Sequence, residues 1–64
     1  MKSEKLKMLL VELQRVSYQK GGAEYIVSGM NDSPLKRATI LYCELLERQQ
    51  NEIVFEIVSN FGEN

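Results

Sequence analysis

The chain has 64 residues, a formal net charge of −1, 44% hydrophobic and 27% charged residues. A chain of this length forms one small domain, residues 1–64, and buries only about 60% of the surface that its unfolded form exposes. Such domains usually rely on a disulfide, a metal or self-association for stability. Cys43 is the only cysteine and histidine is absent. An internal disulfide is therefore excluded, and we expect no metal and no cofactor.

Residues 3–20 carry a helical pattern. Their main apolar side chains recur three and four residues apart, which places them on one face of a helix; they are Leu6, Leu9, Leu10, Leu13 and Val16. The pair Gly21-Gly22 follows, and glycine at this position is typical of a helix C-terminus. We therefore expect the first helix to span residues 3–20.

The segment "AEYIVS", residues 23–28, has no clear period. It is short enough to be a packed connector or a short strand. The stretch "GMNDSP" after it contains the residues that turns favour. We expect a short connector here, with a strand as the alternative.

Residues 34–60 form the second predicted helix. Ser33 followed by Pro34 is the expected start, because serine caps a helix N-terminus and proline is tolerated at its first position. The apolar stripe that we expect to form the core comes next; its members are Leu35, Ala38, Leu41, Tyr42, Leu45 and Leu46. No glycine or proline occurs from residue 35 to residue 61, which favours one continuous helix.

The end of this helix raises a question, because its apolar face rotates by roughly a quarter turn after "RQQNE". A straight helix allows this only if its second half faces a different neighbour from its first half. The alternative is a small α+β fold in which residues 53–58 form a strand paired with residues 23–28. Val, Ile and Phe are residues that strands favour.

The lengths of the two predicted helices suggest self-association. A first helix of residues 3–20 is about 27 Å long and could cover little of the second helix beyond residue 50. The apolar side chains that would remain in water are Ile53, Val54, Ile57, Val58 and Phe61. Exposed clusters of this kind usually mark an interface. We therefore predict an all-α helical hairpin that assembles as a dimeric bundle through these five residues.

The distribution of charge and the length of the apolar runs bear on packing and on cellular location. Residues 1–20 carry five basic and two acidic side chains, whereas residues 34–64 carry three basic and five acidic ones. Opposite charges of this kind suit two segments that pack together. No apolar run approaches the ~18 residues of a membrane span, and a lone cysteine fits a reducing compartment. We expect a cytoplasmic protein without membrane contact.

The chemistry of the sequence predicts binding and no catalysis. Without histidine the commonest general base is missing, and no nucleophile–base pair is recognisable, so we expect no enzyme. We expect a protein–protein interaction module, a small homodimeric regulator or adaptor that binds and modulates a larger protein; in plan, but in no residue motif, it resembles small bacterial and phage regulators. The alternative is a small dimeric nucleic-acid-binding regulator that uses Lys36 and Arg37 at a helix N-terminus.

Overall fold

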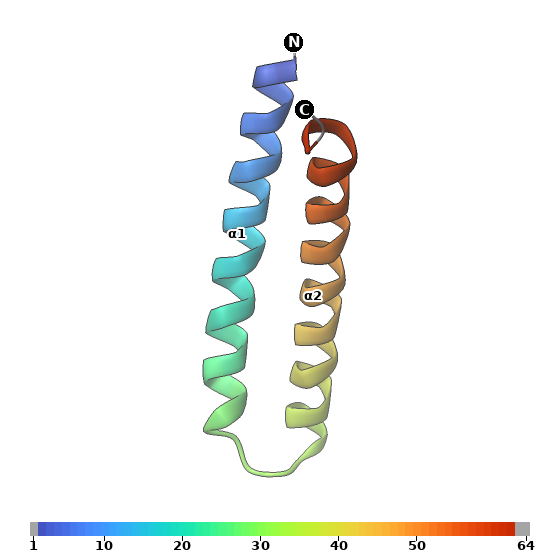
Figure 1. The fold of residues 1–64 in the computed structure, drawn as a ribbon. Coiled ribbons are helices and arrows are strands. Elements are labelled where there is room, and N and C mark those ends of the chain that lie inside the picture. The colour runs from blue at the N-terminus through green and yellow to red at the C-terminus, as the bar shows by residue number, and fades with distance from the viewer. Residues whose placement is uncertain (1, 63–64) are drawn as a thin grey trace.

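The computed structural model describes residues 2–62, which form two helices packed side by side as an antiparallel hairpin (Figure 1). Helix α1 spans Lys2–Ser28 and helix α2 spans Pro34–Phe61. A loop of residues 29–33 joins them at one end, and the start of α1 and the end of α2 lie at the other end. The molecule is a rod of 47 × 15 × 14 Å. This confirms the predicted all-α helical hairpin.

Helix α1 is longer than predicted, because it runs through Gly21-Gly22 and ends at Ser28. No described glycine has a positive φ, so neither residue adopts the left-handed conformation of a helix C-cap. Two interactions across the glycines hold the helix together: the Lys20 Nζ lies 2.8 Å from the Glu24 Oε2, and Ala23 is buried against α2. Packing thus outweighs the cost of about 1 kcal/mol for each helical glycine. The predicted end at residue 20 is wrong.

Helix α2 begins and continues as predicted. The Ser33 Oγ accepts a hydrogen bond of 3.2 Å from the Lys36 backbone N–H, and Pro34 occupies the first turn. The helix then runs unbroken to Phe61. Residues 23–28 and 53–58 are both helical, so the α+β alternative is wrong.

The two helices meet along a seam in which buried and half-buried residues alternate three and four positions apart. This is the spacing that keeps one stripe of a helix facing a partner helix. In α1 the seam consists of Leu6, Leu9, Leu13, Val16, Lys20, Ala23 and Val27; in α2 it consists of Lys36, Thr39, Cys43, Leu46, Gln50, Ile53 and Ile57.

The seam corrects our prediction of which face of α2 forms the core. Of the expected core stripe, residues 35–46, only Leu46 is buried, whereas Leu35 and Leu41 are 67% and 61% exposed. The cause is the rotation of the apolar face along α2. Because α1 reaches the whole length of α2, it packs on the stripe of α2 that contains Ile53 and Ile57, and the neighbouring stripe that contains Leu41 and Leu45 stays in water.

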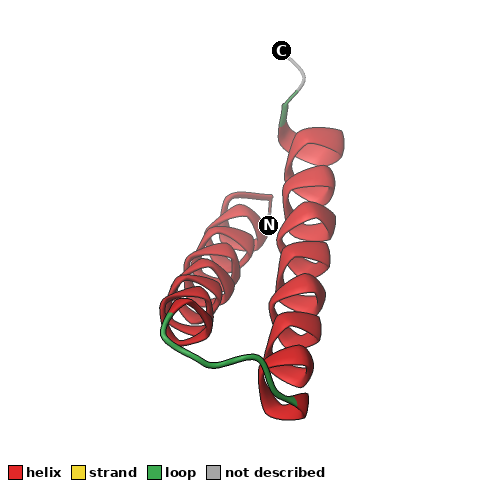
Figure 2. Ribbon diagram, turned by 90° about the horizontal axis from the view of Figure 1, so that it is seen from below, coloured by secondary structure: helices red, strands yellow, loops and turns green. Residues whose placement is uncertain are grey.

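The hairpin alone buries little. Only Val16, Ala23 and Leu46 are buried among the described residues, and the accessible surface is 5228 Å². A compact monomer of 7.4 kDa would expose about 4,200 Å². Figure 2, seen from below, shows the two helices side by side as a single layer.

Candidate functional site

The seam between the helices has one flank on each side of the hairpin. An ion pair between the helices marks one of these two sides. The Lys5 Nζ lies 3.3 Å from the Glu56 Oε2. Residues seven apart in a seamed helix share a face, so Ile26 lies in the row of Lys5, and Tyr42 and Leu35 lie in the row of Glu56. These rows flank the seam on what we call the ion-pair side.

The loop-proximal half of the ion-pair side is apolar. We call it the loop patch, and its members are Ile26, Leu35, Ala38, Leu41, Tyr42 and Leu45. All six are exposed, with Ile26 at 60%, Leu45 at 55% and Tyr42 at 46%. Ala38, Leu41 and Leu45 adjoin the row of Leu35 and Tyr42 at helical spacing. No member carries a charge, so the patch is an apolar area that the hairpin leaves in water.

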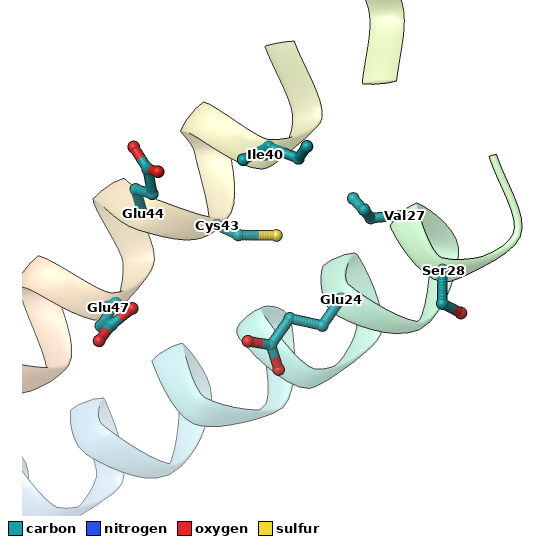
Figure 3. Close-up of a pocket in the computed structure, with 7 residues that line it drawn as sticks. All are labelled: Glu24, Val27, Ser28, Ile40, Cys43, Glu44 and Glu47. Atoms are coloured by element: carbon teal, nitrogen blue, oxygen red, sulfur yellow. The ribbon is translucent and has the colours of Figure 1, made fainter. Parts of the chain in front are cut away.

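The opposite side of the hairpin carries a groove near the loop. It has a volume of about 420 Å³ and is lined by Glu24, Val27, Ser28, Ile40, Cys43, Glu44 and Glu47. Figure 3 shows Val27 of α1 and Cys43 of α2 pointing into the space between the helices. The floor is therefore apolar and the rim carries three carboxylates.

One cation stands beside this groove. The hydrogen bond to Glu24 raises the pKa of the Lys20 ammonium, and the carboxylate charge of Glu47 adds a smaller contribution in the same direction. Lys20 thus stays protonated and partly neutralises the rim. In residues 2–62 no group of acidic, cysteine or histidine side chains is arranged to hold a metal ion.

The groove side ends in a second apolar area near the termini. The Gln50 Nε2 donates a hydrogen bond of 2.8 Å to the Ser17 Oγ, which fixes the helix register. Leu10, one heptad before Ser17, therefore lies at the level of Val54 and Val58. These three side chains are 45%, 44% and 58% exposed, and we call them the terminal patch.

The five residues predicted as an interface are divided by the structure. Ile53, Ile57 and Phe61 are half-buried, and Ile53 packs against the buried core. Val54 and Val58 are exposed and belong to the terminal patch. The premise that α1 stops short of them is wrong, since α1 has 27 residues and α2 has 28. Their part in an interface stays a prediction.

The two basic residues at the start of α2 point in different directions. Lys36 is half-buried in the seam. Arg37 is exposed, and its Nε lies 3.9 Å from the Asp32 Oδ1. The structure therefore does not bring the two cations together on one face.

Comparison with known proteins gave no match, whether with a family model, a curated protein or a solved structure. Neither α1 nor α2, over the residues described, is long and apolar enough to cross a membrane. The loop patch was not predicted from the sequence. The quarter-turn rotation of the apolar face of α2 indicated that part of that face would stay exposed. Which part stays exposed depends on how far α1 extends along α2, and the predicted end of α1 was wrong.

Proposed function

We propose that this protein is a non-enzymatic protein–protein interaction module that self-associates as a homodimer and binds a larger protein as a regulator or adaptor. Its unpaired Cys43 favours the cytoplasm as its compartment. The observation that carries the proposal is the outward face of α2. In the loop-proximal half, α2 turns Leu35, Leu41 and Leu45 to solvent while Lys36 and Thr39 face α1.

The exposed surface has the size that a dimer requires. The hairpin exposes 5228 Å², which is about 1,000 Å² more than a compact protein of its mass. A standard interface removes roughly 800 Å² from each partner. The excess is thus what one such interface would cover.

The energetics favour association at moderate protein concentration. Each large loop-patch side chain gains about 1–2 kcal/mol on burial of its exposed part. Five such side chains in each of two copies give a gross gain of about 10–20 kcal/mol, against an association cost of about 4–15 kcal/mol. The midpoints of these two ranges leave a net gain of about 5–6 kcal/mol, which corresponds to a dissociation constant of roughly 100 μM.

Nucleic-acid binding finds less support. Three cations of the basic first helix are paired with carboxylates: Lys5 with Glu56, Arg15 with Glu12, and Lys20 with Glu24. Binding to phosphates depends on free Lys and Arg side chains. A protein partner suits the acidic groove and the terminal patch better.

Sedimentation equilibrium of the wild-type protein from about 10 μM to about 1 mM, a range around the expected constant, tests the proposal. We expect the average mass to rise from that of the 7.4 kDa chain toward twice that value. A monomer throughout the range would refute self-association. A mass that keeps rising beyond a dimer would refute a closed two-fold assembly.

A further inference from the structure

We propose that the loop patch is the dimer surface and that its occupant is the loop patch of a second copy, with the two α2 helices packed antiparallel. This inference rests on the proposed function and specifies its self-association surface. It differs from the sequence prediction, which placed the dimer interface at residues 53–61.

The spacing within α2 is self-complementary. Leu35, Ala38, Tyr42 and Leu45 lie three, four and three residues apart, which is a second seam beside the one that faces α1. When two copies of this segment run antiparallel about a two-fold axis near residue 40, Leu35 meets Leu45 and Ala38 meets Tyr42. A small side chain then faces a large one, and an isologous interface of this kind closes after two copies.

Helix α1 contributes to the same surface. The Gln50–Ser17 hydrogen bond sets the register, so the residues of α1 level with residue 40 are those near Val27. Ile26 is 60% exposed and lies on the ion-pair side, so it stands close to the proposed axis and meets Ile26 of the other copy. Two hairpins stacked in this way form a four-helix bundle at their loop-proximal halves.

Charges limit the overlap of the two copies. Beyond Leu45 the second seam of α2 continues with Gln49, Glu52 and Glu56, and the matching row of α1 carries Glu12 and Lys5. Like charges and ion pairs on that half favour solvent over a dry interface. The terminal halves therefore extend in opposite directions, and the dimer is longer than the 47 Å of one hairpin.

This arrangement leaves the other surfaces free. The acidic groove lies on the side of the hairpin away from the loop patch, and the terminal patch lies at the far end of the rod. Each dimer would present both surfaces twice. The terminal patch has three exposed apolar side chains against six in the loop patch, so it is the weaker candidate for self-association.

A matched pair of variants tests the assignment. Leu45 and Val58 both lie on α2 and are 55% and 58% exposed, but only Leu45 belongs to the loop patch. We expect Leu45→Asp to raise the dimer dissociation constant at least ~100-fold, because it places two unpaired charges in the interface. We expect Val58→Asp to change it by less than about threefold.

Sedimentation equilibrium and circular dichroism of the wild type and both variants give the outcome. If Val58→Asp dissociates the dimer, or if Leu45→Asp leaves it intact, the assignment is overturned although self-association holds. A monomeric wild type would instead overturn the proposed function itself. If Leu45→Asp loses its helical signal, Ala38→Glu provides the same test at a position where the added side chain meets Tyr42 of the other copy.

Discussion

Replacing Gly21 by alanine tests whether α1 is one continuous helix. An added Cβ at Gly21 meets nothing within 4 Å, and the residue is helical with no positive φ. Alanine is better than glycine in a helix interior by about 1 kcal/mol. We therefore expect Gly21→Ala to raise the free energy of unfolding by about 1 kcal/mol and the melting temperature by ~4–8 °C.

The assay is thermal and urea unfolding followed by circular dichroism, at one fixed protein concentration because the proposed dimerisation would also stabilise the fold. Gly29→Ala is the control: Gly29 lies just after α1, where an added Cβ would make only an ordinary contact of 3.8 Å with the Ile26 carbonyl oxygen. We expect it to change stability much less. A loss of stability in Gly21→Ala would refute the continuous helix, since it would mean that Gly21 ends the helix in a left-handed conformation.

Two further perturbations address packing and charge. Leu46→Ala, at a side chain only 4% exposed, should lower the free energy of unfolding by about 2–4 kcal/mol in urea titrations, and a loss below 1 kcal/mol would contradict its place in the core. The hydrogen bond from Arg15 lowers the pKa of Glu12, so this pair contributes stability above the unfolded pKa of Glu12 and loses it as the pH falls through the lowered folded value. In Arg15→Ala, NMR titration of the Glu12 carboxyl should show a higher titration midpoint than in the wild type. An unchanged midpoint would show that Arg15 and Glu12 do not interact in solution.

The sequence predicted the hairpin through its local signals. Apolar spacing indicated both helices, and the Ser33-Pro34 pair located the start of α2. The strand alternative failed because the absence of glycine and proline from residue 35 to residue 61 outweighed the β-favouring Ile, Val and Phe side chains. Cys43 is half-buried in the seam.

The extent of α1 and the rotation of α2 depend on tertiary packing, and the sequence did not predict either. Gly21-Gly22 is a local stop signal that burial of Ala23 and the pairing of Lys20 with Glu24 override. Because α1 extends to Ser28, it is about as long as α2 and packs against the face of α2 that carries Ile53 and Ile57. Local patterns cannot reveal this choice, because both faces of α2 are apolar over half its length.

The loop patch and the terminal patch would give a small chain two separate contact surfaces. The loop patch suits a second copy because its pattern complements itself. The terminal patch and the acidic groove suit a different partner, one that offers apolar side chains flanked by basic residues. In the proposed arrangement, the first contact would stabilise a chain with so small a buried core, and the second would serve its function.

An isotope-filtered NOE experiment on dimers that combine one labelled and one unlabelled chain can identify the residues in contact between the two copies. Such an experiment reports only contacts between copies. We predict cross-peaks between the Tyr42 ring of one chain and the Ala38 methyl group of the other, and none from Ile53 or Ile57. Interchain cross-peaks from Ile53 and Ile57, with none from the loop patch, would show that the tail of α2 faces a second copy and would contradict the account.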